Sequence, residues 1–319
     1  MSGASPQRGS VKAKFAEGWY LVCWSADLGP GEVMPLRYFA RDFVLFRTES
    51  GEPKLLDAHC PHLGAHLGYG GRVEGDEVIC PFHGWRFSSE GRCTAVPYAS
   101  RIPPRAAIRS YAVSEHSEMI LAYIGREGSS PSYEVPPIDE LDDPAWTPLE
   151  RSEVTIATQP REVIENIADR AHFGPVHGQF IDDFEMIIDG PRAIQRTMGR
   201  GGTLDGKPIP VKTVATYHGP AVQFTHLGWA YDMVLINAHV PIDEDQLQLR
   251  FGVSLRTGEG TKIDRKVILR HVAAARDGYF QDVAIWEHKR WRDRPLLADG
   301  DGPIGKIREW YQSFFAEEA

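Results

Sequence analysis

The chain has 319 residues, of which 44 are acidic and 35 are basic, so its net charge at neutral pH is −9. Apolar residues make up 42% and charged residues 25%, as in an average soluble globular protein. This composition excludes a disordered chain, a fibrous chain and a small disulfide-built domain, and the acidic balance argues against nucleic acid as the main partner.

The length allows about two domains of ordinary size. No stretch approaches the roughly 18 consecutive apolar residues of a membrane helix, so we expect no membrane span. The first 14 residues are polar and lack the apolar core of a secretion signal. We therefore expect a cytoplasmic protein, in which the four cysteines stay reduced and serve as ligands or core residues.

The first part of the chain has the pattern of a small all-β domain. Short runs with high β-propensity predict strands, and segments with glycine and proline separate them. The predicted strands include Trp19–Trp24, Val33–Arg37, Asp42–Arg47, Pro53–Leu56, Trp85–Phe87 and Met119–Ile124. A segment rich in Ser, Pro and acidic residues follows. We therefore place an all-β domain at 15–125 and a linker at 126–150.

The rest of the chain, 151–319, combines helix and strand signals and predicts an α+β domain. A helix is expected from Arg161 to Phe173, where Gly174-Pro175 would end it. Further elements are several strands within 211–257, a long helix from about Lys262 to Arg290 and an amphipathic helix from about Ile304 to Phe315.

Two short loops each offer one cysteine and one histidine. The first is Cys60-Pro-His62-Leu-Gly, and the second, Cys80-Pro-Phe-His83-Gly, follows after 17 residues between His62 and Cys80. A zinc site also uses two Cys and two His, but its like ligands are usually grouped together. One thiolate and one imidazole per loop instead suit a two-iron cluster in which one iron takes sulfur and the other nitrogen.

These loops resemble the Rieske iron–sulfur motif, including its flanking glycines and prolines. The resemblance implies a Rieske-type 2Fe–2S cluster held by Cys60, His62, Cys80 and His83. The respiratory-complex branch is disfavoured because Ala65 and Phe82 stand where that branch has two further cysteines. Four other residues match no ligand position and are expected to be structural: His59, His66, Cys23 and Cys93.

A second group of polar residues lies about 80 residues downstream of the Cys/His loops. Asn166, Asp169 and His172 are spaced three apart, so they are expected to share one face of the predicted helix. The Gly-Pro pair after that helix would turn His177 back toward His172. Two imidazoles and one carboxylate form the facial triad of non-haem Fe(II) oxygenases. The pattern alone is weak evidence for a metal, and the neighbouring Rieske motif strengthens it.

The spacing Asn-x2-Asp-x2-His-x4-His resembles the mononuclear-iron motif of Rieske oxygenases. The resemblance implies that His172 and His177 bind Fe(2+). It also implies that Asp169 is not a ligand but connects His172 to His83 of a neighbouring subunit. The alternative for Asp169 is an exposed salt bridge on a helix. Asn166 is expected to lie near the iron without binding it.

A carboxylate far downstream is expected to complete the iron site. Asp282 lies among Tyr279, Ile285 and Trp286 at spacings of three and four, and a carboxylate on an apolar stripe is costly unless it has a metal or another strong partner. Asp282 also matches the Asp-x3-Trp context of the family, which implies that it is the third ligand. Asp277 and Glu287 are the alternatives.

The resemblance covers nearly the whole chain. It implies the terminal oxygenase component of a Rieske non-haem iron oxygenase: a Rieske domain followed by a helix-grip (START/Bet v1-like) catalytic domain. The C-terminal part is similar to the branch of ketosteroid hydroxylases and cholesterol desaturases, which implies that O2 is used to hydroxylate or desaturate a hydrophobic, steroid- or sterol-like substrate. The alternative substrate is a smaller aromatic compound. Candidate residues lining a substrate cavity are Phe224, Trp229, Tyr231, Met233, Leu235 and Asn237.

Family-style electron transfer between neighbouring subunits implies a head-to-tail homotrimer. The sequence has no dinucleotide-binding fingerprint, so a separate NAD(P)H-dependent reductase, with or without a ferredoxin, is expected to supply electrons. The basic run Lys289–Arg292 is either a docking site for that partner or a solvated helix end. The rival from another class is a Rieske electron carrier without oxygenase activity, which would need only the first 125 or so residues.

Overall fold

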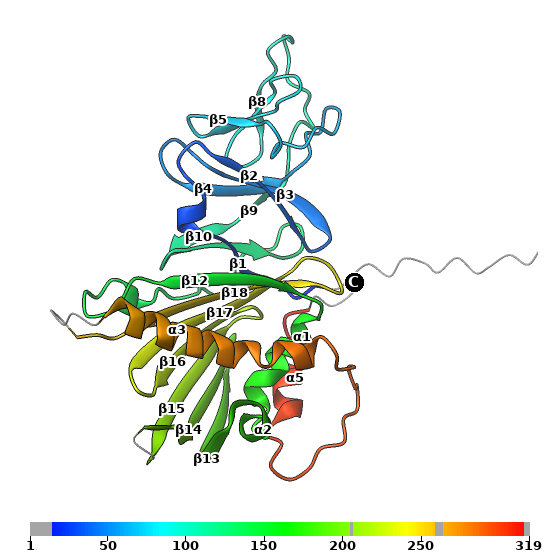
Figure 1. The fold of residues 1–319 in the computed structure, drawn as a ribbon. Helices are drawn as coiled ribbons and strands as arrows, with labels where there is room; N and C mark the ends of the chain where they lie inside the picture. The colour runs from blue at the N-terminus through cyan, green and yellow to red at the C-terminus, as the bar shows by residue number, and fades with distance from the viewer. Residues whose placement is uncertain (1–14, 205–206, 259–263, 316–319) are drawn as a thin grey trace, which may run out of the picture.

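The computed structural model describes residues 15–204, 207–258 and 264–315, and its two parts lie one above the other (Figure 1). The N-terminal part consists of three small antiparallel sheets. The first has the order β1 (Gly18–Trp24), β11 (Met119–Ile124), β10 (Val113–His116). The second has the order β2 (Val33–Tyr38), β3 (Arg41–Arg47), β4 (Pro53–Asp57), β9 (Ser110–Tyr111). The third has the order β5 (Arg72–Glu74), β6 (Glu77–Ile79), β7 (Arg86–Phe87), β8 (Cys93–Ala95).

The strands predicted in this part are confirmed to within two residues at each end. β11 shows why its apolar run forms a strand. It is buried along its whole length, and its alternate side chains enter two different cores. Leu121 and Tyr123 face the C-terminal part, while Ile120 and Ala122 face the second sheet.

The C-terminal part is built on one seven-stranded antiparallel sheet. Its order is β12 (Glu150–Ile156), β18 (Leu247–Leu255), β17 (Asp232–Pro241), β16 (Val222–Gly228), β15 (Lys207–His218), β14 (Arg192–Leu204), β13 (Gln179–Asp189). Helix α3 (Arg265–Phe280) crosses one face of this sheet, which is the predicted helix-grip arrangement (Figure 1). β13 and β14 lie outside the segment in which the sequence predicts strands. A β-bulge between Ile181 and Asp183 interrupts the two-residue alternation in β13.

The single helix predicted from Arg161 to Phe173 is wrong. Helix α1 (Pro160–Glu165) passes into a 3₁₀ turn that ends at Ala168, and a separate short helix, α2 (Phe173–His177), follows. Asp169 has an extended backbone, and its carboxylate accepts hydrogen bonds from the N–H groups of Ala171 and His172, which competes with helix formation. Asn166, Asp169 and His172 therefore do not share a helix face.

The role predicted for Gly174-Pro175 is also wrong, because this pair lies inside α2 instead of ending a helix. A proline is tolerated there because the N–H groups in the first turn of a helix have no intrahelical partner.

The long helix predicted from about Lys262 to Arg290 is also interrupted. Lys262 lies outside the described residues, and α3 begins after Asp264, whose carboxylate accepts the N–H of Lys266. The helix ends at Phe280, and a four-residue helix, α4 (Val283–Trp286), follows. The predicted C-terminal helix is confirmed as α5 (Ile304–Gln312), which buries one apolar face against β14 and β15.

The segment 126–150, expected to be a linker, is irregular except for one 3₁₀ turn and its last residue, which begins β12, and it contributes to a core between the two parts of the chain. Its buried residues Val135, Ile138 and Leu149 pack with β1 and β11 on one side and with Phe224 and other residues of the large sheet on the other. One face of the large sheet is thus used for packing against the N-terminal part. The opposite face is left for α3 and a cavity. No helix in the described ranges is long and apolar enough to cross a membrane.

Candidate metal centres and substrate cavity

The two Cys/His loops have the same backbone turn. One connects β4 to β5 and the other connects β6 to β7. In each loop the N–H of a glycine donates to the carbonyl of the cysteine four residues earlier, Gly64 to Cys60 at 2.9 Å and Gly84 to Cys80 at 3.1 Å. Both glycines have positive φ, 77° and 71°, a conformation that favours glycine. The two turns therefore present their side chains in matching ways.

The side chains of the two loops come together at one place. Cys60 and Cys80 are buried, and the imidazole rings of His62 and His83 are 4.7 Å apart between centroids. Burial, with a smaller contribution from Cys80, raises the pKa of the Cys60 thiol to about 11. A thiol with this pKa becomes a thiolate at neutral pH only when a cation binds it.

His62 carries a further sign of metal binding. Its Nδ1 is buried and has no hydrogen-bond partner among the described residues. The ring stacks on the indole of Trp85 at 4.7 Å and 7°, and Trp85 in turn donates to the hydroxyl of Tyr98 at 2.9 Å, so the orientation of the imidazole is fixed. A buried ring nitrogen without a partner is costly unless it coordinates a metal. Two thiols and two imidazoles in this arrangement fit a 2Fe–2S cluster.

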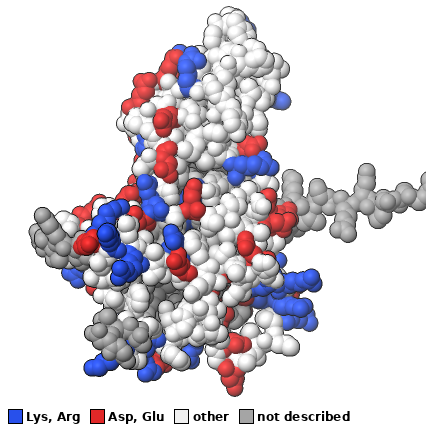
Figure 2. Space-filling view, viewed as in Figure 1, with Lys and Arg blue, Asp and Glu red and all other residues white. Residues whose placement is uncertain are grey.

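The surface around these loops is apolar. Four large side chains near them are more than half exposed: Leu63, Tyr69, Phe82 and Tyr98. Figure 2 shows few charged side chains over this end of the molecule in the view drawn. Exposed apolar surface of this kind commonly marks a contact with another protein.

The four residues that were expected to be structural have no hydrogen-bond partner in either ligand set among the described residues. His59 donates from Nδ1 to the carbonyl of Gly64 at 3.1 Å, and Nδ1 of His66 accepts the N–H of Gly68 at 3.0 Å. Cys23 and Cys93 are buried in the cores of the N-terminal part.

A second cluster forms in the C-terminal part. One potential ligand atom each from His172, His177 and Asp282 lies within 4.8 Å of the others. His172 immediately precedes α2, His177 ends it, and Asp282 occupies the junction between α3 and α4. The Asp282 carboxylate is only 3% exposed, and its Oδ2 lies 3.4 Å from Nε2 of His177. A buried carboxylate next to two imidazoles fits a divalent cation such as Fe(2+).

Hydrogen bonds set the tautomers of both histidines. Nδ1–H of His172 donates to the backbone carbonyl of Asp169 at 2.6 Å, and Nδ1–H of His177 donates to Oε1 of Gln281 at 2.9 Å. With the proton on Nδ1, the lone pair of Nε2 is free for a metal in each ring. Burial lowers the pKa of His177, but the hydrogen bonds to Asp282 and Gln281 outweigh burial and raise the pKa above its ordinary value.

The other residues predicted near this site differ in their distance from the three candidate ligands and in their contacts. Asn166 donates from Nδ2 to Oδ2 of Asp282 at 3.1 Å, so it lies beside the ligand set. The side chain of Asp169 is about one-third exposed, and within one chain α2 and the sheet with the Cys/His loops lie at opposite ends of the molecule (Figure 1). The alternatives to Asp282 are engaged elsewhere: Asp277 pairs with Arg276, and Glu287 accepts the N–H of Ala157.

Gln281 was not among the predicted site residues. The sequence offers one signal for Gln281, which is its position directly before Asp282. Both side chains lie at the break between α3 and α4 and contact His177.

A cavity of about 400 Å³ adjoins the triad, between the large sheet and α3. Met233, Leu235 and Asn237 line it from alternate positions of β17, and Trp229 lies at its wall with Nε1 donating to the carbonyl of Gly201. The two remaining predicted lining residues have other environments. Phe224 belongs to the core on the opposite sheet face, and Tyr231 packs against His271.

Comparisons with known proteins agree with this geometry. Residues 18–112 match the Rieske 2Fe-2S domain, and residues 122–315 match the 3-ketosteroid 9alpha-hydroxylase C-terminal domain. The chain is 33% identical to a 3-ketosteroid-9-alpha-monooxygenase, oxygenase component, from Rhodococcus rhodochrous, covering 98% of this chain and 85% of that protein. It is 29% identical to the cholesterol 7-desaturase of Caenorhabditis elegans, covering 98% and 79%. The crystal structure of dicamba monooxygenase bound to 3,6-dichlorosalicylic acid has the same fold, with a TM-score of 0.78, 18% identity and coverage of 95% and 98%.

Proposed function

Because the chain belongs to the Rieske non-haem iron oxygenases, with a catalytic domain of the 3-ketosteroid 9α-hydroxylase type, we propose that it hydroxylates or desaturates a steroid- or sterol-like substrate. Membership of the family makes the chain the oxygenase component of an O2-dependent monooxygenase, with a Rieske cluster, a mononuclear iron and a separate reductase.

The proposed ligands follow from the donor sets described above. Cys60, His62, Cys80 and His83 hold the cluster, in a Rieske domain at 15–125. The iron is held by His172, His177 and Asp282, in a catalytic domain at 151–319. When bound, the cluster supplies single electrons and the iron activates O2 for attack on an unactivated C–H bond.

The residues around the iron ligands orient them. Asn166 holds the Asp282 carboxylate, while Gln281 and the carbonyl of Asp169 hold the two imidazoles. Outer hydrogen bonds of this kind keep the ligands in one geometry and set the basicity of the histidines.

One observation supports the substrate proposal above all others: the triad, with its two partly buried histidines and the buried Asp282, adjoins a largely apolar cavity of about 400 Å³. This volume is within the range of about 300–1,000 Å³ typical of ligand pockets. In this proposal the apolar walls hold a rigid apolar molecule by contact, and the position of the cavity determines which carbon faces the proposed iron ligands. The two similar proteins named for steroid and sterol chemistry support the same class.

We propose a head-to-tail homotrimer in which the Cys/His loops of one subunit contact the catalytic domain of the next. Three features support this assembly: the separation of the two sites within one chain, the partly exposed Asp169, and the apolar side chains around the loops. In this arrangement Asp169 accepts a hydrogen bond from the partner subunit's His83 and connects it to His172.

The electron donor is proposed to be an NAD(P)H-dependent reductase, with or without a ferredoxin, and the location cytoplasmic, where the four cysteines stay free of disulfides. The basic run Lys289–Arg292 is a weak docking candidate. Lys289 pairs with Glu162 at 2.7 Å and with Glu165, and the indole of Trp291 contacts the guanidinium groups of Arg161 and Arg308.

The test is a turnover assay with a surrogate reductase and a panel of sterols, ketosteroids and aromatic acids, followed by mass spectrometry. A steroid or sterol that gains one oxygen atom or loses two hydrogen atoms supports the proposal. Turnover of an aromatic acid alone contradicts the substrate class and leaves the oxygenase chemistry intact. Asp282→Ala serves as the inactive control.

A further inference from the structure

A group of buried polar side chains lies on the sheet wall of the otherwise largely apolar cavity. Gln223 and Thr225 extend from β16, and Asn237 extends from β17 as the direct cross-strand partner of Gln223. All three are more than nine-tenths buried, and all three line the cavity. Met233 and Leu235 line the same wall, so these polar side chains lie next to apolar ones.

The hydrogen bonds of this group leave one acceptor unused. Asn237 donates from Nδ2 to Oε1 of Gln223 at 2.9 Å and to Oγ1 of Thr225 at 3.4 Å. Oδ1 of Asn237 is buried without a hydrogen-bond partner in the described part of the chain. Buried amide oxygens are almost always paired in folded proteins, so an unpaired one on a residue that lines a cavity indicates a ligand group that completes it.

Gln223 supplies the neighbouring donor. Its Oε1 faces Asn237, so its amide NH2 is the end that is left for another acceptor. The wall thus offers an acceptor on Asn237 beside a donor on Gln223. A hydroxyl group matches both, because it donates one hydrogen bond and accepts another. A ketone only accepts, and it would leave Oδ1 of Asn237 unpaired.

We propose that Asn237 and Gln223 form a polar subsite that binds an alcohol group of the substrate, remote from the carbon that is oxidised. This inference rests on the proposed function of the cavity and narrows its substrate class to hydroxylated steroids or sterols. An alcohol is preferred to the matching ketone because only the alcohol satisfies the buried amide oxygen.

The test uses pairs of steroids that differ only by a hydroxyl or a ketone at carbon 3 or at carbon 17. Equilibrium binding is followed by quenching of tryptophan fluorescence, since Trp229 and Trp286 line the cavity, and turnover is measured separately. For the wild-type protein we expect the alcohol of at least one pair to bind roughly 10- to 100-fold more tightly than its ketone.

Asn237→Leu keeps the volume of the side chain and removes the acceptor. We expect it to weaken alcohol binding by roughly the same factor and to leave ketone binding unchanged, so that the preference disappears. Thr216→Val is the control. The hydroxyl of Thr216 lies on β15 next to Phe224, on the sheet face away from the cavity, so its loss should not alter the binding of either ligand.

The outcomes separate this inference from the proposed function. A preference for the ketone, or equal weakening of both ligands by Asn237→Leu, overturns the subsite even if steroids are turned over. Alcohol-selective binding without turnover retains the subsite and contradicts the proposed reaction on steroids. Absence of binding by both members of every pair overturns the subsite and the steroid assignment together.

Discussion

Asn166 donates a hydrogen bond to Asp282 across 3.1 Å of space and 116 residues of sequence. The oxygen that accepts it, Oδ2, is the same atom that lies 3.4 Å from Nε2 of His177. The residue that directly follows α1 thus orients a carboxylate between α3 and α4, next to an imidazole at the end of α2. Three separate segments of the chain are coupled at one oxygen atom.

Replacing Asn166 by Ala removes this orienting hydrogen bond and leaves the three proposed ligands in place. We expect the affinity for mononuclear iron to fall by about 10- to 100-fold, because outer hydrogen bonds to ligands have effects of this size. Titration of the metal-depleted catalytic site with Fe(2+) measures the affinity. The visible absorption of the Rieske cluster, which should not change, is the internal control. Unaltered iron affinity would show that the Asp282 carboxylate does not need Asn166.

The identity of the third ligand is tested by comparing two aspartates on neighbouring turns. Asp282→Ala is expected to lower the iron content from about three to about two atoms per chain, because the cluster accounts for two. Asp277→Ala is the matched control and should keep about three, since Asp277 lines the same cavity but pairs with Arg276. If wild-type protein itself contains only two iron atoms per chain, the assignment of a mononuclear site is wrong.

The sequence predicts the ligand sets better than the path of the chain around them. The Cys/His spacing and the carboxylate on an apolar stripe are local features, and the structure brings His172, His177 and Asp282 together. The helix expected to carry Asn166, Asp169 and His172 on one face is wrong, because the Asp169 side chain bonds to the backbone N–H groups that follow it. The spacing of residues in the sequence does not show that a side chain competes with the helix for backbone N–H groups.

The cavity wall was harder to predict for another physical reason. β17 is buried on both faces, with Val234 and Ile236 against the N-terminal part and Met233 and Leu235 along the cavity. A strand with two buried faces has no apolar–polar alternation, so the sequence does not tell which residues face a ligand. The cross-strand pair of Gln223 and Asn237 depends on the register of β16 and β17, which becomes visible only in the folded sheet.

The proposed bridging role of Asp169 predicts a selective defect. Asp169→Asn should keep both metal centres, because the backbone carbonyl of Asp169, and not its carboxylate, accepts the hydrogen bond from His172. Electron transfer from the Rieske cluster to the mononuclear site should fall strongly, because the carboxylate that would connect two subunits is lost. Single-turnover oxidation of the pre-reduced cluster, followed by its visible absorption, gives this rate.

Asp183→Asn is the matched control for Asp169→Asn, since Asp183 is an exposed carboxylate on the nearby strand β13. It should oxidise its cluster at the wild-type rate. A normal rate for Asp169→Asn in trimeric protein would contradict the bridging role, whereas loss of iron in that variant would assign Asp169 to metal binding instead.

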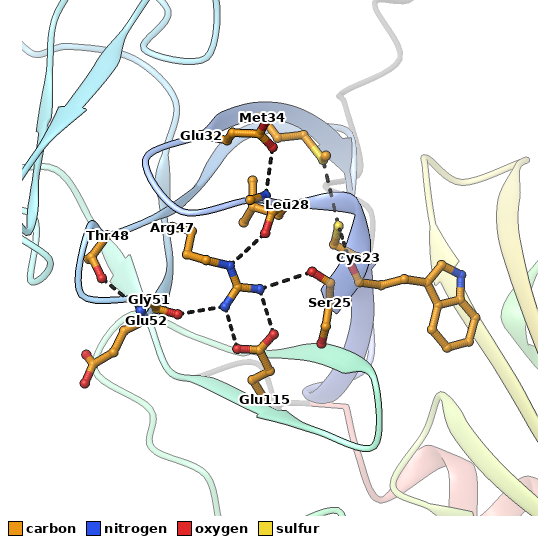
Figure 3. A network of polar contacts seen from close by, with 12 residues as sticks. Cys23, Ser25, Leu28, Glu32, Met34, Arg47, Thr48, Gly51, Glu52 and Glu115 are labelled. Atoms are coloured by element: carbon orange, nitrogen blue, oxygen red, sulfur yellow. Dashed lines mark hydrogen bonds and ion pairs between the residues drawn. The ribbon is translucent and has the colours of Figure 1, made fainter. Parts of the chain in front are cut away.

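In the N-terminal part, the buried Arg47 forms an ion pair with the solvent-exposed Glu115, and this pair predicts a pH-dependent stability. Arg47 on β3 forms two hydrogen bonds of 2.7 Å to the carboxylate of Glu115 on β10, and it also donates to the carbonyls of Leu28, Gly51 and Ser25 (Figure 3). The hydrogen bonds from Arg47 lower the pKa of Glu115 below its ordinary value of 4.5. Folding therefore favours the ionised form of Glu115. The hydrogen bonds between its carboxylate and the guanidinium group of Arg47 connect the first and second sheets.

Since folding depresses the pKa of Glu115, its contribution to stability is complete above about pH 4.5 and is lost as the pH falls through the lower pKa of the folded state. Glu115→Gln should reduce the free energy of unfolding by about 1–2 kcal/mol at pH 7, because a hydrogen bond to a charged group stabilises the fold but Glu115 is partly screened by solvent. The difference from wild type should shrink as the pH is lowered below 4.5. Denaturant unfolding followed by circular dichroism at a series of pH values measures the loss of stability and its pH dependence.

Asp182→Asn is the control. It breaks the exposed pair with Arg200 and should lower the free energy of unfolding by less than about 1 kcal/mol. If the free energy of unfolding of Glu115→Gln stayed below that of wild type by the same amount down to low pH, the loss of stability would come from packing and not from charge.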